Sequence, residues 1–400
     1  MDATSAIAYQ EHLFYNRNME PINRLKLLSS QMSFEADVDA STTLPPEACS
    51  RVDDIYIHPA VMPHGRKIRL LKTLLSSACE RDCFYCPFRA GRNFRRATFK
   101  PEDFACLFMQ LHKANLADGL FVSSGVAGGG MRTQDQLLDT ADILRTKMGF
   151  KGYLHLKIMP GAEKAQVLRA MQLADRVSVN LEAPNKKRLA QLAPRKVFWE
   201  ELLQPLRWVE EIRRTKSPHN AWKGKWASST TQFVAGGADE SDLELLSTTA
   251  RGYKDLGLAR TYFMAFNPVP DTPLENKSAT PALRELRLYQ ASFLLRDYGF
   301  DLEELPFVGE GNLPLPTDPK MAWAEINLKH APVEVNAATP RELLRVPGIG
   351  PKLAKKIVGA RRTRQLRDLS QLKKLGIATG RAAPYLLLGG KKAAQQARLF

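Results

Sequence analysis

The sequence has little cysteine and no long apolar run. Its five cysteines are an odd number and three lie within eight positions, so they do not resemble the disulfide framework of a small secreted domain. No segment approaches the roughly 20 apolar residues of a membrane-spanning helix. Acidic and polar residues interrupt the first 20 positions, where a secretory signal needs an apolar stretch. We therefore expect a cytoplasmic protein without a membrane segment, whose clustered cysteines serve metal or redox chemistry.

Positive charge is in excess, and it is concentrated near the C-terminus. Of the formal net charge of +16, residues 331–400 carry +12, because 15 lysines and arginines oppose three acidic residues there. A basic segment this concentrated attracts a polyanion, and nucleic acid is the first candidate. A solvated basic tail is the alternative.

The apolar pattern indicates a β/α architecture. From about Ile68, short apolar runs alternate with longer amphipathic stretches, as in β/α units around a parallel sheet. Strands are expected at residues 68–76, 119–123, 152–158, 176–181, 230–234 and 260–266. Helices are expected at residues 101–115, 133–146, 163–172, 197–214, 241–255 and 281–298. Six repeats are too few to close an eight-stranded barrel, so we expect an open, partial one.

Composition also predicts the domain organisation. Residues 1–60 show no sustained periodicity and are expected to form an irregular or partly helical extension. The partial barrel would span residues 61–305. A linker rich in proline and glycine, residues 306–332, would join it to a small all-α domain at residues 333–400.

Three cysteines form the most specific motif. Cys79, Cys83 and Cys86 follow the first predicted strand as C-x3-C-x2-C, at the strand end where β/α barrels place their chemistry. Thiolates are the soft ligands that iron–sulfur clusters require, and three of them can hold three irons of a cubane. The fourth iron is then open to a substrate or cofactor.

Two other interpretations of these cysteines exist. A structural zinc site would need a fourth ligand, such as Cys49, Cys106 or a distant histidine like His64, and the spacing favours none of them. A dithiol pair of Cys83 and Cys86 on a thioredoxin-like fold would leave Cys79 surplus. We interpret Cys49 and Cys106 as structural residues, with Cys106 on an apolar helix face.

The cysteine motif, with Tyr85 just before its last cysteine, resembles that of the radical SAM superfamily. The resemblance implies a [4Fe-4S] cluster on the three cysteines, whose open iron chelates S-adenosylmethionine. An electron from the reduced cluster then releases a 5′-deoxyadenosyl radical, so an electron donor such as flavodoxin or ferredoxin is implied as a partner.

The same resemblance implies which residues seat the cofactor. They are Tyr85, Ser123, Ser124, Gly125, Asn180, Glu182 and Gly236. The match at Ser123-Ser124-Gly125 is partial, because the family has a Gly-Gly-Glu-like turn there. An ordinary strand-end turn is the alternative for the serine and glycine positions. No catalytic side chain is assigned.

The C-terminal segment contains a hairpin between two helices. Thr339-Pro340-Arg341-Glu342 predicts a helix start with a capping box, and a second helix is expected from Pro351 to about Arg362. Glycines in the hairpin let the backbone approach a phosphate, while the next helix presents N–H groups and lysines. The residues expected to bind nucleic acid are Pro347, Gly348, Ile349, Gly350, Lys352, Lys355 and Lys356. A weaker copy follows at 369–388, with Leu375-Gly376-Ile377 as a second hairpin.

This segment resembles the helix-hairpin-helix motif of DNA repair and recombination proteins. The expected fold class is therefore α/β, a partial (β/α)6 barrel of radical SAM type followed by a small all-α helix-hairpin-helix domain. Together the two parts resemble radical SAM proteins assigned to DNA modification or repair and linked to a uracil-DNA glycosylase-like partner. Two alternatives remain open: an RNA-modifying enzyme, and a non-catalytic DNA-binding adapter with a structural or redox-sensing cluster.

Overall fold

The structure is a computed structural model that describes residues 19–34, 50–52, 55–62 and 65–392. The chain divides into two compact units. One comprises residues 1–240 and 251–280, and the other comprises residues 241–250 and 281–400. Cys49 and His64 lie outside the described residues.

The first unit is built on one eight-stranded sheet whose strands follow one another in chain order. Its six parallel strands are β3 (Lys67–Leu74), β4 (Gly119–Ser123), β5 (Tyr153–Lys157), β6 (Arg176–Glu182), β7 (Ser228–Ala235) and β8 (Arg260–Ala265). These are the six strands that the sequence predicts. Two antiparallel strands, β1 (Ser50–Val52) and β2 (Ile55–Val61), extend the sheet beyond β3. The sequence did not predict them, because only Ile55 and Ile57 of β2 are buried and Pro59 interrupts the strand pattern.

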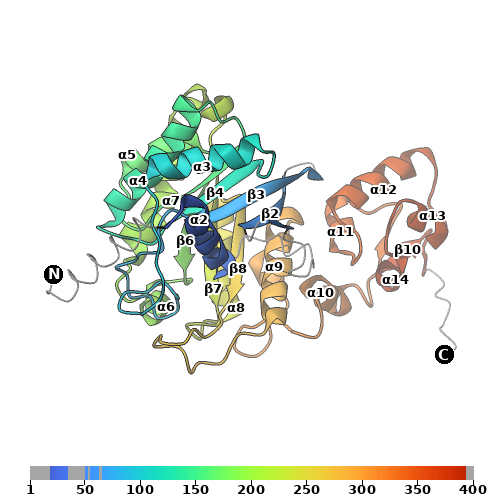
Figure 1. Cartoon of the computed structure of the whole chain (residues 1–400). Coiled ribbons are helices and arrows are strands. Elements are labelled where there is room, and N and C mark those ends of the chain that lie inside the picture. The colour runs from blue at the N-terminus through green and yellow to red at the C-terminus, as the bar shows by residue number, and fades with distance from the viewer. Residues whose placement is uncertain (1–18, 35–49, 53–54, 63–64, 393–400) are drawn as a thin grey trace. The chain divides into compact units, whose positions relative to one another are not determined.

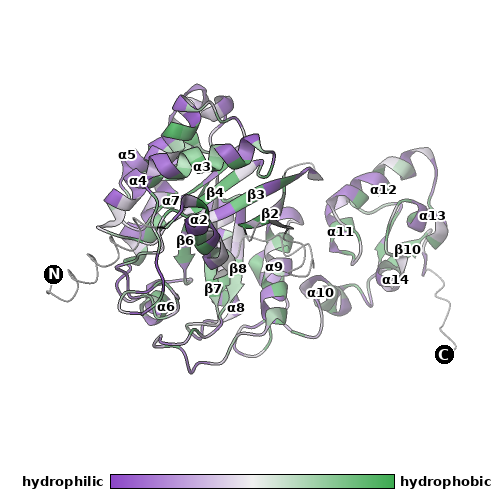
Figure 2. Ribbon diagram, viewed as in Figure 1, coloured by the Kyte–Doolittle hydropathy of each residue, from purple (hydrophilic) through white to green (hydrophobic). Residues whose placement is uncertain are grey.

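Helices cover the outer face of the sheet (Figure 1). They are α2 (Pro21–Ser30), α3 (Pro101–Lys113), α4 (Gly130–Asp142), α5 (Lys164–Leu173), α6 (Lys186–Leu192) and α7 (Gln204–Thr215). All five residues of β4 are buried, because the helices cover one face of the sheet and the barrel interior fills the other. Figure 2 shows the same division, with apolar β4 beside the polar outer faces of α4 and α5.

The second unit begins with part of α8 (Asp242–Asp255) and with α9 (Ala282–Asp297). It continues through α10 (Pro319–Asn327), α11 (Pro340–Arg345), α12 (Pro351–Thr363), α13 (Leu369–Lys374) and α14 (Thr379–Ala382). Helix α10 lies within the segment expected as a linker. Strands β9 (Val333–Glu334), β10 (Leu386–Leu388) and β11 (Lys391–Lys392) form a small sheet, which the prediction of an all-α domain did not include. Leu343, Ile349, Ile357 and Leu372 are buried in one apolar core.

The expected fold class is confirmed, since a partial barrel of six parallel strands is followed by a helix-hairpin-helix unit. The domain boundaries remain predictions, because compactness does not test independent folding. Across the described residues, we find no helix with the length and apolar character needed to cross a membrane.

Candidate functional site

The cysteine loop follows β3 and is tied to its neighbours by backbone hydrogen bonds. The N–H of Glu80 donates to the Val126 carbonyl at 2.7 Å, and the N–H of Phe84 donates to the Leu192 carbonyl at 2.7 Å. The carboxylate of Glu80 also accepts from the N–H of Gly128 at 3.0 Å. The loop is therefore held from the ends of β4 and α6, two elements far from it in sequence.

The Arg96 side chain connects the two ends of this loop. Its buried guanidinium donates to four backbone carbonyls, those of Ser77 (2.8 Å), Phe88 (3.0 Å), Arg89 (2.9 Å) and Arg92 (3.3 Å). A guanidinium has five N–H donors in a fixed fork, so one side chain can fix both ends of the loop. The sequence did not single out Arg96, because its basic neighbourhood resembles a solvated charge run.

A cavity of about 380 Å³ opens beside the loop, in the size range of small-molecule sites. Nine of the predicted residues line it: Cys79, Cys83, Tyr85, Cys86, Ser123, Ser124, Gly125, Asn180 and Glu182. Gly236 is not among its lining residues, and its N–H donates to the carboxylate of Glu240 instead. The structure thus brings together all but one of the metal and cofactor residues expected from the sequence.

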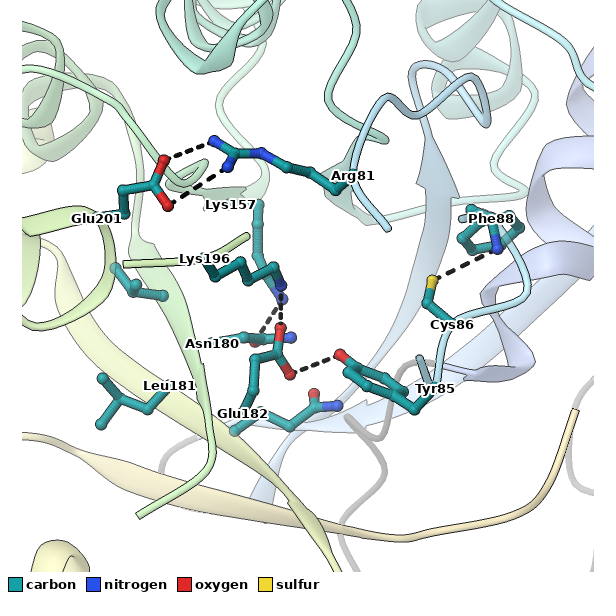
Figure 3. Close-up of polar contacts among 12 residues, drawn as sticks. Arg81, Tyr85, Cys86, Phe88, Lys157, Asn180, Leu181, Glu182, Lys196 and Glu201 are labelled. Carbon is teal, nitrogen blue, oxygen red and sulfur yellow. Dashed lines mark hydrogen bonds and ion pairs between the residues drawn. The ribbon is translucent and has the colours of Figure 1, made fainter. Parts of the chain in front are cut away.

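Glu182 lies at the centre of a buried polar network in this cavity (Figure 3). The Lys196 ammonium donates to its carboxylate at 2.8 Å, and the Tyr85 hydroxyl donates to it at 2.6 Å. Burial alone would raise the pKa of Glu182, but the charge and hydrogen bonds of Lys196 and Tyr85 lower it. The pKa of Lys196 is raised in spite of its burial, by Cys83 and Glu182. Both members of the pair are therefore charged at neutral pH.

Lys196 was missed by sequence reasoning. It lies in the loop after α6, next to exposed Arg195, and no spacing connects it with the cysteines. Its ammonium also opposes the effect of burial on the thiols, since burial raises the pKa of Cys83 and Lys196 lowers it. Cysteine thiols must lose their protons to bind iron, so a nearby ammonium favours the binding form.

The backbone at Glu182 is in an unusual conformation. Its φ is +63°, in the left-handed region that side chains other than glycine seldom occupy. The pairing of β6 with β7 shifts register between Asn180 and Glu182 at a β-bulge. Bulges redirect side chains next to active sites, and here both residues line the cavity.

Two further polar pairs lie on the inner face of the sheet. The Lys157 ammonium donates to the Asn180 amide oxygen at 2.6 Å and also lines the cavity. A ring nitrogen of His155 lies 2.9 Å from the Ser178 hydroxyl. Burial and the nearby cations Arg176 and Lys157 lower the pKa of His155 well below its usual range, so it is neutral. Of the two basic residues Lys157 and His155, only Lys157 lines the cavity.

The donor set of the cysteine loop fits a cluster. A single tetrahedral zinc draws all of its ligands to one point, whereas each thiolate of a cubane binds a different iron. Among the described residues, no three His, Cys, Asp or Glu side chains are grouped to hold one metal ion. The three thiols nevertheless line one cavity, and nearby thiols contribute to the raised pKa values of Cys83 and Cys86.

The expectation that Cys106 lies on the apolar face of its helix is wrong. Its side chain is exposed on α3, whose buried face is formed by neighbours such as Phe104, Ala105 and Phe108. The helical repeat places position 106 on the opposite face. Cys106 does not line the cavity.

The predicted hairpin is formed in the second unit. Thr339 caps α11 in a capping box: its hydroxyl accepts from the Glu342 N–H at 3.2 Å, and its own N–H donates to the Glu342 carboxylate at 2.6 Å. Helix α11 ends at Arg345, and Gly350 precedes α12. Gly348 has a φ of +82°, which explains the glycine at this turn. The side chains of Lys352, Lys355 and Lys356 are exposed on α12.

The second hairpin is also formed and lies against the first. Gly376 has a φ of +95° between α13 and α14. A Cβ on Gly348 would lie 3.1 Å from the Ala378 carbonyl oxygen, and one on Gly376 would lie 3.7 Å from Leu353. Each hairpin therefore contacts the start of the helix that follows the other.

The chain thus combines a partial β/α barrel, with a thiol-lined cavity, and a pair of helical hairpins. A family model described as a helix-hairpin-helix motif matches residues 329–379. A search of curated proteins gives no match.

Several solved structures are similar to the chain. HydG, described as a maturase of the [FeFe]-hydrogenase, is 11% identical with a TM-score of 0.44, over 57% of this chain and 49% of that one. The FeFe-hydrogenase maturase HydG from Carboxydothermus hydrogenoformans is 12% identical with a TM-score of 0.44, over 57% and 51%. Methylornithine synthase (PylB) is 15% identical with a TM-score of 0.44, over 58% and 64%. The chain spans less than two thirds of each of these proteins.

Proposed function

We propose that this protein is a radical SAM enzyme that repairs or modifies DNA. The observation that carries the proposal is the 380 Å³ cavity, which Cys79, Cys83 and Cys86 line together with polar residues from the ends of β4 and β6. In the proposal, the three cysteines hold a [4Fe-4S] cluster. When bound, the cluster and S-adenosylmethionine supply an organic radical that abstracts hydrogen from the substrate.

The residues of the cavity have distinct parts in this proposal. Gly125 keeps the β4 end in close backbone contact with the cysteine loop. Glu182 and Lys196 place opposite charges at one wall, where they suit the ammonium, carboxylate and hydroxyl groups of S-adenosylmethionine. Tyr85 holds Glu182 in place from the cysteine loop.

The hairpin unit supports the choice of a nucleic acid as substrate. Hairpin glycines, the N-terminus of α12 and three exposed lysines are suited to phosphates, and such contacts hold a polymer without reading its sequence. A base in a duplex would have to leave the stack to reach a barrel cavity. An electron donor such as flavodoxin or ferredoxin and a uracil-DNA glycosylase-like partner remain predictions from the family resemblance.

Single substitutions of the cysteines test the proposal. In Cys79→Ala, Cys83→Ala and Cys86→Ala, we expect anaerobic reconstitution to leave no intact cluster and no 5′-deoxyadenosine to form from S-adenosylmethionine with dithionite. Cys106→Ala is the matched control, because this thiol is exposed on α3 and lies outside the cavity. It should keep both iron and cleavage. Cleavage that survives in all three variants would refute the assignment, as would a wild-type protein that binds no iron.

A further inference from the structure

A second cavity, of about 720 Å³, lies within the second unit. One wall is the last turn of α9 and the residue after it, with Phe293, Arg296 and Tyr298. The other is the start of α12, with Gly350, Lys352 and Leu353. It is distinct from the thiol-lined cavity of the first unit, and it adjoins the first hairpin.

Several contacts fix the two walls to each other. Arg345 of α11 donates to the Gly299 carbonyl at 3.0 Å and lies 3.7 Å from the centre of the Phe300 ring. The Lys320 ammonium donates to the carbonyl of Ile349 in the hairpin at 2.6 Å, and it lies 4.6 Å from the centre of the Tyr298 ring. These groups all belong to one compact unit.

The chemistry of the walls is that of a site for a nucleotide. Phe293 and Tyr298 provide aromatic rings; Arg296 lies 5.1 Å from the centre of the first ring, and Lys320 lies beside the second. A base stacks on such rings whatever its sequence. Arg296 is paired with Asp297 at 2.8 Å, so the net charge of the lining comes from Lys352. The N–H groups of Lys352 and Leu353, which follow Pro351 in the first turn of α12, have no intrahelical partner. A phosphate therefore suits one wall, and a planar ring suits the other.

We propose that this cavity holds one unpaired nucleotide of a DNA strand, with its phosphate at Gly350 and Lys352 and its base against Tyr298 and Phe293. The inference rests on the nucleic-acid binding in the proposed function and narrows its substrate to DNA with an unpaired segment. A paired base is stacked between its neighbours and cannot offer its faces to protein rings. The hairpin lysines bind paired and unpaired DNA alike, so the aromatic wall is what distinguishes the two.

Binding of two DNA probes to the full-length protein tests this inference. One probe is a fully paired, fluorescently labelled duplex, and the other is the same duplex with a short single-stranded gap. We expect the wild type to bind the gapped probe more tightly, as measured by anisotropy at one salt concentration. Tyr298→Ala should weaken binding of the gapped probe by roughly 5- to 150-fold, the loss of one stacked base, and change the paired probe by less than about 2-fold.

Matched variants distinguish stacking from a loss of structure. Tyr298→Phe keeps the ring and should bind like the wild type. Phe293→Ala should repeat the selective loss if Tyr298→Ala melts at a lower temperature. Ile326→Ala removes an exposed apolar side chain of α10 that does not line the cavity, and it should leave the affinity for both probes unchanged.

The outcomes separate this inference from the proposed function. If the wild type binds both probes equally and neither aromatic variant changes the affinity for the gapped probe, the nucleotide site is refuted while DNA binding stands. An equal loss on both probes would also refute it. If the wild type binds neither probe, the DNA part of the proposed function fails first. Tighter binding of gapped RNA with the same loss in Tyr298→Ala would overturn the assignment to DNA.

Discussion

At the scale of single residues, Gly125 has almost no room for a side chain. A Cβ at this position would lie 2.2 Å from the carbonyl oxygen of Ala78, which is backbone next to Cys79. Gly125→Ala should therefore displace the cysteine loop, and we expect most of the iron to be lost after reconstitution. Iron content and the melting temperature check this. Gly359→Ala is the control, because its Cβ would meet no atom within 4 Å. Full iron binding by Gly125→Ala at an unchanged melting temperature would contradict the role of this contact.

The pair of Lys196 and Glu182 allows a second prediction at this scale. Their side chains are 10% and 3% exposed, so removing one partner leaves a charge buried. Lys196→Met should lower the free energy of unfolding of the first unit by about 3–5 kcal/mol. The double variant Lys196→Met/Glu182→Gln should recover part of that loss, because no unpaired charge remains. Urea unfolding measures both, and equal stability of the single variant and the wild type would show that the pair contributes little.

At the scale of elements, Lys320 connects α10 with the hairpin. Burial lowers its pKa to about 7, with Asp318 raising it and Arg381 and Arg345 lowering it further. Between pH 7 and the ordinary lysine pKa near 10.5, the unfolded chain therefore binds a proton that the folded chain does not. The contribution of Lys320 to stability is then least favourable at low pH and improves as the pH rises through this window.

This linkage gives a pH prediction. Thermal unfolding of the second unit is measured at pH 6.5 and at pH 9, roughly on either side of the Lys320 pKa. We expect Lys320 to destabilise the folded unit less at pH 9 than at pH 6.5. Lys320→Met should remove that part of the pH dependence. The Ile349 carbonyl loses its donor in this variant, so the comparison concerns the slope with pH and not the absolute stability. A slope equal to that of the wild type would contradict the low pKa.

At the scale of the whole molecule, the two units should carry separable activities. Lys352→Ala/Lys355→Ala/Lys356→Ala removes three exposed charges from α12 without touching the thiol-lined cavity. We expect the dependence of log Kd for duplex DNA on log salt to become shallower by up to about 2.7, if each lysine contacts one phosphate. Formation of 5′-deoxyadenosine without DNA should stay unchanged. An unchanged salt dependence would show that DNA binds elsewhere.

Much of this architecture follows from local sequence patterns. Residue patterns only a few positions long predict the six parallel strands, the helices between them and the capping box at Thr339. The pattern was insufficient for β2, where burial is confined to Ile55 and Ile57, and for α10, which lies in a segment rich in proline. The pattern also placed Cys106 on the buried face of its helix, whereas its side chain is exposed.

The sequence by itself determined the spacing of the three thiols, the order of β/α units and the basic hairpins, because each depends on residues close together in the chain. Only the tertiary structure decided that Tyr85 meets Glu182, 97 positions away, and that Lys196 completes the pair. It also decided that Tyr298 lies opposite Gly350. Such convergence depends on how a sheet curves and how helices pack, and the same local patterns are compatible with many packings.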